Sequence, residues 1–226
     1  MYKEPAKIDP AVLERKQAAA PALKIRPPLE YVLNEEGRIV DVETEGITFK
    51  VKVRRWIGQL LFNAIVTYIP SHMIRLAWLR FFGAEIGKGS SVMRGVQVQD
   101  VHYLTIGENS TVGMRCRIDA RSGLYIGNNV TIASDVNLLA GGHDINHPDF
   151  PIVGPDPTVV EDYVWIASRS MVLPCHIKRG AVVAAHALVI KDIDELVVVG
   201  GNPAKPIGKR NPGALKYSAG YRPLFM

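Results

Sequence analysis

Cysteine is scarce in this chain of 226 residues, which contains only Cys116 and Cys175. The two lie far apart and neither belongs to a Cys-x-x-Cys pair, so a disulfide framework and a zinc knuckle are both disfavoured. Hydrophobic residues make up 47% and charged residues 22%, which is ordinary for a soluble globular protein. The length allows one sizeable core plus an appended segment.

Dense basic runs are also missing, although 27 Lys and Arg against 22 Asp and Glu leave a net charge of +5. Without such runs and interleaved aromatic residues, nucleic acid is not an expected partner. The surplus fits an anionic ligand, a membrane surface or a solvated exterior. Residues 1–28 are polar and interrupted by prolines, without the basic-then-apolar arrangement of a signal peptide. The expected location is therefore cytoplasmic.

The first residues of the chain divide by pattern into an arm and a strand segment. Residues 1–28 are expected to form a mobile N-terminal arm, with a short helix around residues 11–20. Residues 29–53 alternate apolar and polar positions, as in 37–42 (GRIVDV) and 47–53 (ITFKVKV). This alternation predicts short strands.

Residues 56–82 predict two helices broken at Pro70, so that the segment 29–83 combines short strands with two helices. Neither helix is long enough to cross a bilayer, and Arg75 and Arg80 interrupt the second. The helices are expected to pack on the main domain or on a neighbouring subunit. A peripheral membrane contact through the same residues is the alternative.

From residue 84 onward an aliphatic residue recurs every six positions, in five sets of three. A helix repeats with a period of 3.6 residues and a simple strand with a period of 2, so period six indicates a repeat architecture. The fifteen positions are Ile86, Val92, Val98, Ile106, Val112, Ile118, Ile126, Ile132, Leu138, Val160, Ile166, Val172, Ile177, Val183 and Val189.

The period fits a triangular prism in which three six-residue faces make one coil and each aliphatic residue points inward. Four places later the side chain is small or valine, as a tight corner requires: Ser90, Val96, Ser110, Cys116, Val130, Val136, Val164, Ser170, Ala181 and Ala187. Roughly five to six stacked coils are expected over residues 84–200, followed by a C-terminal tail at 201–226. The period does not fix the handedness.

The repeat is interrupted at length between Leu138 and Val160. Residues 141–158 (GGHDINHPDFPIVGPDPT) show no repeat and carry two histidines, three aspartates and four prolines. The stretch is expected to leave the prism as a protruding loop. Long irregular loops on regular scaffolds are commonly functional.

Three segments resemble motifs of the hexapeptide-repeat acyltransferases: 142–150 (GHDINHPDF), 160–168 (VEDYVWIAS) and 197–207 (VVVGGNPAKPI). Over residues 84–210 the chain is similar to the galactoside, maltose and nodulation-factor acetyltransferases, and most of all to the O-acetyltransferases of colanic-acid and capsule biosynthesis. The resemblance implies an all-β fold, a left-handed parallel β-helix, with an N-terminal α/β extension.

The resemblance also implies an enzyme that transfers an acetyl group from acetyl-CoA to a hydroxyl of a sugar or glycan-type acceptor. His143 matches the family's general base. An alcohol is a poor nucleophile at neutral pH, and an imidazole that takes its proton accelerates attack by about 10²–10⁴-fold. The family's acceptor attacks the thioester directly, without an acyl-enzyme, and N–H groups stabilise the oxyanion. His147 is a weaker candidate for an acceptor contact.

Acetyl-CoA is expected as a co-substrate, and no metal is expected. Four positions match family residues around the donor, Trp165, Ser168, Ala185 and Lys191, and Lys205 is a fifth candidate for binding the donor. Lys205, Lys209 and Arg210 form a basic cluster suited to a phosphate group. Ala167 and Cys175 stand where the family usually has glycine. Because the family's donor lies between neighbouring subunits of a trimer, a homotrimer is implied.

Other interpretations stay open at this point. A γ-class carbonic anhydrase shares the prism and needs three convergent imidazoles for zinc, although the spacing of the available histidines differs from that family: His102, His143, His147, His176 and His186. A non-catalytic trimeric β-helix scaffold is the third possibility. Arg115, Arg117 and Arg121 either suit an acceptor with phosphate or carboxylate groups, or belong to an exposed face of the β-helix.

Overall fold

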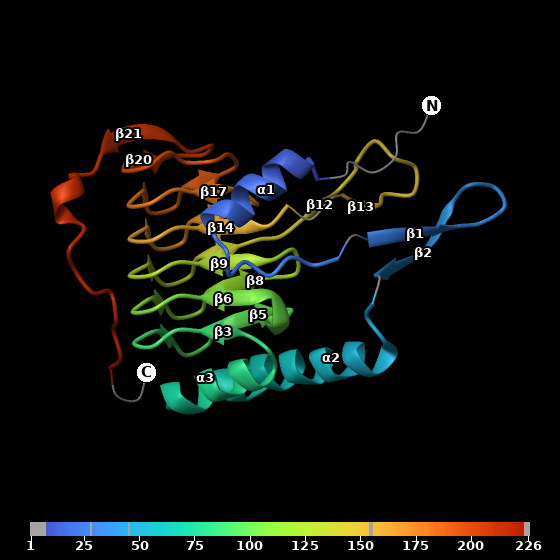
Figure 1. Ribbon diagram of the computed structural model, residues 1–226, viewed down its shortest axis with the longest axis horizontal. Coiled ribbons are helices and arrows are strands. Elements are labelled where there is room, and N and C mark those ends of the chain that lie inside the picture. The colour runs from blue at the N-terminus through green and yellow to red at the C-terminus, as the bar shows by residue number, and fades with distance from the viewer. Residues whose placement is uncertain (1–7, 28, 45, 154–155, 224–226) are drawn as a thin grey trace.

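The computed structural model describes residues 8–27, 29–44, 46–153 and 156–223. Its main body is a parallel β-solenoid, in which short strands stack coil upon coil (Figure 1). Five complete coils and a partial sixth lie between residues 85 and 200. The predicted β-helix of hexapeptide repeats is confirmed.

Three parallel sheets form faces 1, 2 and 3, numbered in the order in which each coil passes through them. Face 1 contains β3 (Glu85–Ile86), β6 (Leu104–Ile106), β9 (Leu124–Ile126), β14 (Thr158–Val160) and β17 (His176–Ile177). Face 2 contains β4 (Ser91–Val92), β7 (Thr111–Val112), β10 (Thr131–Ile132), β15 (Trp165–Ile166), β18 (Val182–Val183) and β20 (Val197–Gly200). Face 3 contains β5 (Gln97–Gln99), β8 (Arg117–Asp119), β11 (Asn137–Leu138), β16 (Met171–Val172) and β19 (Leu188–Val189).

The six-residue period of the sequence corresponds to the positions that point into the solenoid and stack from coil to coil. All fifteen aliphatic repeat positions are buried, with at most 9% of each residue exposed, and they belong to one continuous core cluster. Equivalent positions stack directly, as Val112, Ile132 and Ile166 do on face 2. Full burial of one such side chain contributes about 1.5–3 kcal/mol. A single coil leaves this row open at both ends, so stability comes from stacking.

The small corner residues join one coil to the next through hydrogen bonds. Ser110 shows the pattern: its Oγ donates to the carbonyl of Gly127 at 2.7 Å and accepts the backbone N–H of Val130 at 2.9 Å. Cys116 fills an equivalent corner, where its Sγ lies 3.0 Å from the carbonyl of Ala133. Burial raises the pKa of the Cys116 thiol to about 12, which agrees with the predicted packing role.

Two helices close the base of the solenoid (Figure 1). Helix α2 (Phe49–Ala64) is followed by a 3₁₀ turn η1 (Val66–Tyr68) and helix α3 (His72–Phe81), so the predicted pair with a break at Pro70 is present. Phe62, Leu76 and Leu79 are buried and join the core of the first coils. The prediction of a strand at 47–53 is wrong. Because its alternating apolar residues are not buried on either side, nothing holds them extended, and residues 49–53 instead form the start of α2.

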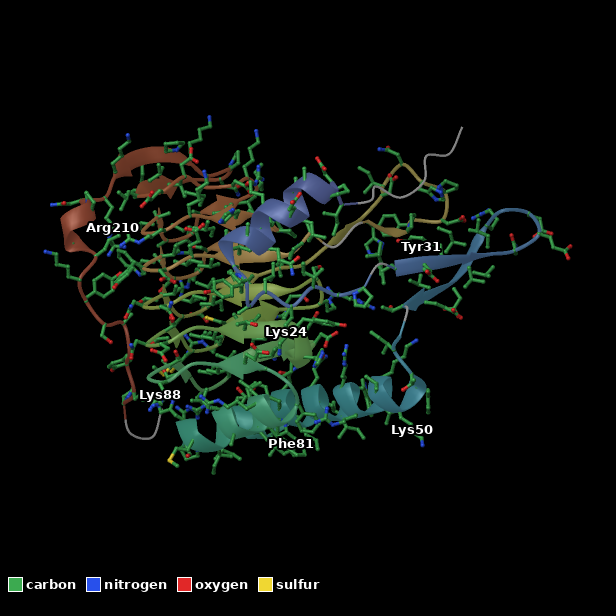
Figure 2. The ribbon with its side chains drawn as sticks, in the orientation of Figure 1. Lys24, Tyr31, Lys50, Phe81, Lys88 and Arg210 are labelled. Carbon is green, nitrogen blue, oxygen red and sulfur yellow. The ribbon has the colours of Figure 1, made fainter. Side chains whose placement is uncertain are left out.

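The outer side of these helices carries large exposed apolar residues. Phe81 and Lys50 lie on this side (Figure 2). The exposed apolar side chains on this side are Phe49, Val53, Trp56, Ile57, Leu60, Met73, Ile74 and Phe81. A hollow lies among them, lined by Phe49, Lys50, Val53, Arg54, Ile57, Phe81 and Phe82.

The described part of the N-terminal arm packs on the solenoid. Helix α1 (Pro10–Ala19) begins after Asp9, whose carboxylate accepts the N–H of Ala11. Ala20 and Leu23 are buried against Val159 of face 1. The expected helix is present, and Lys16, Ala20 and Leu23 are the buried residues within 8–27. The mobility of the arm stays a prediction. Residues 1–7 lie outside the described part.

Two further segments complete the fold. Strands β1 (Leu29–Leu33) and β2 (Ile39–Thr44) form an antiparallel hairpin that stands away from the solenoid (Figure 1). At the other end of the chain, β21 (Lys205–Lys209) pairs antiparallel with β20, and the 3₁₀ turn η3 (Pro212–Ala214) follows. Residues 211–223 then run back along the solenoid toward its base (Figure 1).

Candidate functional site

The loop 141–158 leaves the solenoid at the corner between faces 3 and 1. It follows β11 of the third coil and returns to β14 of the fourth. Within it, β12 (Gly142–His143) and β13 (Ile152–Val153) pair antiparallel and project from the body of the molecule (Figure 1). His143 therefore lies at the root of an exposed hairpin and not inside the prism.

One ring nitrogen of His143 is engaged and the ring is exposed. Its Nδ1 lies 2.8 Å from the backbone carbonyl of Phe150. A carbonyl oxygen only accepts, so Nδ1 carries the hydrogen, and in the neutral ring Nε2 keeps the lone pair. The imidazole also stacks on the ring of Phe150, with centroids 4.3 Å apart and planes 7° apart. These contacts fix the orientation of the ring and leave Nε2 as a proton acceptor.

The interior of the loop is held by its own hydrogen bonds. The N–H of Asp144 donates to the carbonyl of Pro151 at 3.0 Å, and the N–H of Phe150 donates to the carbonyl of His147 at 3.0 Å. The Nδ1 of His147 accepts the N–H of Asp149 at 3.1 Å. His147 thus has a structural part within the loop, and its acceptor contact stays a prediction.

The β1–β2 hairpin contacts the loop at two places that the sequence did not indicate. Arg38 forms an ion pair with Asp149, whose carboxylate also accepts the N–H of Ile39 at 3.0 Å. The hydroxyl of Tyr31 donates to the carbonyl of Ile152. Figure 2 shows Tyr31 on the side of the hairpin that faces the loop.

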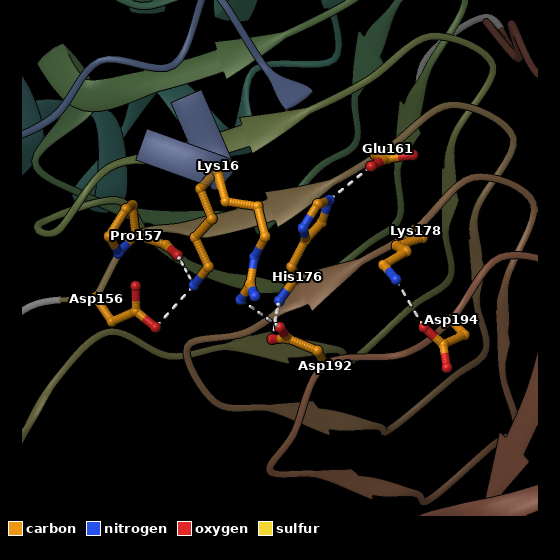
Figure 3. Close-up of polar contacts among 9 residues, drawn as sticks. Lys16, Asp156, Pro157, Glu161, His176, Lys178, Asp192 and Asp194 are labelled. Carbon is orange, nitrogen blue, oxygen red and sulfur yellow. Dashed lines mark hydrogen bonds and ion pairs between the residues drawn. The ribbon is translucent and has the colours of Figure 1, made fainter. Parts of the chain in front are cut away.

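Helix α1 holds the returning limb of the loop. The Nζ of Lys16 donates to Asp156 Oδ2 and to the carbonyl of Pro157, each at 2.7 Å (Figure 3). The Lys16 side chain is fully buried and that of Asp156 is 33% exposed. The segment 8–44 therefore contacts the loop both near His143 and at the return to face 1.

Four of the five predicted donor residues lie around one corner, between faces 2 and 3. Trp165 projects outward from face 2 and is 47% exposed. Ser168 and Ala185 follow on successive coils, where the N–H of His186 donates to the carbonyl of Ser168 at 3.1 Å. Lys205 pairs with Gly200 where face 2 reaches the same corner in the last coil. The row extends over three coils.

Lys191 and the loop lie at the opposite edge of face 3. Lys191 follows β19 at the corner between faces 3 and 1, the corner at which the loop leaves two coils earlier. The structure therefore does not bring Lys191 to the other four residues. In one chain, face 3 separates the donor corner from the loop of His143.

The predicted basic cluster is smaller than expected. Lys205 and Lys209 are exposed at the two ends of β21. The Arg210 guanidinium instead donates to the carbonyl of Tyr163 at 2.8 Å and to the hydroxyl of Tyr217 at 2.9 Å. Arg210 thus fixes the C-terminal segment against the solenoid, which leaves two lysines for an anionic ligand.

Two of the three arginines on and just after the second coil are already paired. Arg115 binds Asp135 through Nε at 2.8 Å and Nη2 at 2.9 Å. Arg121 binds Asp119 through Nη2 at 2.7 Å. Their charges are largely met by neighbouring carboxylates, which weakens the idea of an anionic acceptor here and favours an exposed face.

The histidines do not converge. Within residues 8–27, 29–44, 46–153 and 156–223, no group of three or more His, Cys, Asp or Glu side chains is placed to hold a metal ion. Nε2 of His176, on face 1, instead donates to the carboxylate of Glu161 at 2.6 Å (Figure 3).

Comparison with solved structures defines the class of fold. A hexapeptide-repeat acetyltransferase of Vibrio cholerae, solved with acetyl coenzyme A, matches with a TM-score of 0.65 at 21% identity, over 74% of this chain and 92% of that one. A galactoside acetyltransferase in complex with coenzyme A matches with a TM-score of 0.65 at 24% identity, over 81% and 92%. The fold is thus the left-handed β-helix of hexapeptide-repeat proteins.

No family model matches the sequence. WcaF of Escherichia coli K12, whose name assigns it to colanic acid biosynthesis as an acetyltransferase, is 33% identical over 133 residues, which is 58% of this chain and 72% of WcaF. This chain therefore belongs to the hexapeptide-repeat acetyltransferase family. The predicted resemblance is confirmed.

Proposed function

We propose that this protein transfers an acetyl group from acetyl-CoA to a hydroxyl of a sugar or glycan-type acceptor, with His143 as general base. The observation that carries the proposal is the hydrogen bond from Nδ1 of His143 to the carbonyl of Phe150. It holds the tautomer in which Nε2 can accept a proton. The relative WcaF, named as an acetyltransferase of colanic acid biosynthesis, supports a glycan-type acceptor.

The reaction needs one base and no covalent enzyme intermediate. As the acceptor oxygen attacks the thioester carbonyl, its proton passes to Nε2 of His143, and the carbonyl becomes a tetrahedral oxyanion. The intermediate collapses by breaking the carbon–sulfur bond, and the imidazolium returns the proton to the leaving sulfur. The products are the acetyl ester and free CoA, so atoms and charge balance. The exposed ring of His143 suits this exchange, since acceptor and donor must both reach it.

The corner between faces 2 and 3 is our candidate donor site. Trp165 offers an exposed ring, and the small residues Ser168 and Ala185 leave room for a narrow chain beside the coils. Lys205 lies at the end of this row and could pair with a phosphate of the donor. The Vibrio and galactoside enzymes with this fold were solved with acetyl-CoA and CoA, which supports this class of donor.

A homotrimer would explain why the two halves of the site are apart. Face 3 lies between the donor corner and the loop of each chain, so a donor on one chain could meet His143 of a neighbour. Lys191, which shares the corner of the loop, would then face the donor of the adjacent copy. We propose that the active site forms between subunits.

Helices α2 and α3 are our candidate for a peripheral membrane contact. No helix among the described residues is both long and apolar enough to span a bilayer. The exposed apolar side of the pair carries Lys50 and Lys52, and no Asp or Glu occurs from 47 to 84. Such a face suits the surface of an anionic bilayer. Flotation with phosphatidylglycerol vesicles should recover the wild type but not Trp56→Glu, while recovery of both would refute the contact.

Titration calorimetry with acetyl-CoA and kinetics of His143→Ala together test the proposed function. We expect saturable binding near one site per chain in both proteins, and a loss of turnover of about 10²–10⁴-fold in the variant. Turnover is measured as CoA release with a panel of sugars. A variant with a near-normal rate would overturn the role of His143. Absence of acetyl-CoA binding would favour a non-catalytic scaffold.

A further inference from the structure

The β1–β2 hairpin contacts the loop on both sides of Phe150, the residue whose carbonyl orients His143. On one side, Asp149 binds Arg38 Nε and the N–H of Ile39, the latter at 3.0 Å. The Asp149 side chain is only 5% exposed, so water does not compete freely for these bonds. These contacts of Asp149 with the hairpin are the first anchor, and Asp149 immediately precedes Phe150.

The second anchor lies two residues after Phe150. The hydroxyl of Tyr31 donates to the carbonyl of Ile152, and Ile152 is the residue that pairs with His143 across β12 and β13. Tyr31 belongs to β1 and Ile39 to β2, so both strands of the hairpin contribute.

Phe150 itself has a backbone conformation that needs support. Its φ of +48° lies in the left-handed region, which is uncommon for a bulky residue. Such conformations persist when the surroundings determine them. The contacts of Asp149 and Ile152 with the hairpin fix the chain on either side of Phe150 and so hold this conformation. The carbonyl of Phe150 in turn accepts the hydrogen of His143 Nδ1 at 2.8 Å.

We propose that the β1–β2 hairpin positions the general base, with Arg38 and Tyr31 as positioning residues that act through Asp149 and Ile152. The inference rests on the proposed role of His143. Among the described residues, Arg38 and Tyr31 form no hydrogen bond with the ring of His143; they bond to the chain whose carbonyl selects its tautomer. A base on a loop outside the solenoid would otherwise sample many orientations, and a displacement of 1 Å can cost about 10²-fold in rate.

The charge state of the first anchor agrees with this role. The N–H of Ile39, together with the Arg38 guanidinium, holds the pKa of Asp149 below its usual range, although partial burial opposes this. Asp149 is therefore ionised at neutral pH. The bond from Arg38 is then charge-assisted, which makes it stronger than a neutral one.

Kinetics of four variants separate positioning from structure. We expect Arg38→Ala to lower kcat by about tenfold with an unchanged KM for acetyl-CoA, and Arg38→Lys to recover part of the loss. Arg179→Ala is the matched control, because Arg179 is 45% exposed in an ion pair with Glu195 at another corner. It should keep the wild-type rate. His143→Ala in the same series tests the base itself.

A second readout does not require an acceptor. The ¹⁵N shifts of the His143 ring, assigned by comparison with His143→Ala, should show the Nδ1–H tautomer in the wild type and a mixture in Arg38→Ala. Unchanged tautomer and kcat in Arg38→Ala would overturn the inference and leave His143 as the base. A full rate in His143→Ala would overturn the proposed function as well. If Arg38→Ala fails to fold, Tyr31→Phe removes one hydroxyl only, and the same two readouts decide.

Discussion

Replacing Asp156 with alanine leaves the ammonium of Lys16 in a site that is closed to water. Lys16 is fully buried, and both of its hydrogen bonds go to the end of the loop, to Asp156 Oδ2 and the carbonyl of Pro157. The converse change, Lys16→Met, keeps the apolar stem and removes the charge. The two variants therefore break the same pair with different consequences.

The structure sets the size of the effect. Removing one partner of a buried ion pair costs about 3–5 kcal/mol. Asp156 is one-third exposed, its Oδ1 is buried without a partner among the described residues, and Pro157 still accepts one bond. These features lower the cost of Asp156→Ala to about 2–3 kcal/mol, and that of Lys16→Met to about 1 kcal/mol. In a chain of this size, the melting temperature should fall by about 4–12 °C and about 2–4 °C respectively.

Thermal unfolding followed by circular dichroism checks this order. Circular dichroism at 20 °C confirms that each variant starts from the native fold. Both variants remove the same contact, so if the pair contributed only its own attraction, the two changes would lower the melting temperature by about the same amount. A larger fall in Lys16→Met than in Asp156→Ala would refute the reasoning from an uncompensated buried charge.

Two other predictions follow from the coils. Gly113→Ala should lower the free energy of unfolding by about 1–3 kcal/mol, because its Cβ would lie 2.5 Å from the backbone of Ala133, whereas Gly208→Ala, with no atom nearer than 3.9 Å, should be neutral in urea unfolding. Burial raises the pKa of Glu161, but hydrogen bonds from His176 and the N–H of Arg179 outweigh it and leave the pKa below its usual value of 4.5. A lowered carboxyl pKa stabilises the folded state above that value and the gain is lost on acidification, so Glu161→Gln should flatten the loss of stability below about pH 4.5 in acid titrations.

The solenoid was predictable because all the aliphatic repeat positions share the same environment, the buried interior of the prism. Each aliphatic position meets its equivalent above and below, so any polar residue there would open the core, and the period survives in the sequence. The loop was predictable for the opposite reason, since residues 141–158 lack the row. Motifs shared with the family located His143, although no pattern in this sequence alone fixes its tautomer.

The contacts of the N-terminal segment could not be predicted in the same way. Arg38 and Asp149 lie 111 residues apart in the sequence, and each is an ordinary surface residue by type. Lys16 is indistinguishable from a solvated lysine until the fold places Asp156 and Pro157 beside it. Apolar and polar residues alternate over residues 47–53 as they do in a strand, yet no other part of the fold covers one side of this segment. Without such burial, the alternation does not determine its secondary structure.

The C-terminal segment changes how the stack of coils is expected to come apart. A linear array of repeats frays from its free ends, because a terminal coil has only one neighbour. Here Arg210 binds Tyr163 of the fourth coil, Thr111 Oγ1 of the second donates to the carbonyl of Ala219, and Ser91 Oγ of the first donates to that of Tyr221. The C-terminal segment thus links early and late coils. Fraying of the first coil must therefore also detach this segment, which starts from the last coil. The array becomes more nearly a closed cooperative unit, in which both ends melt together.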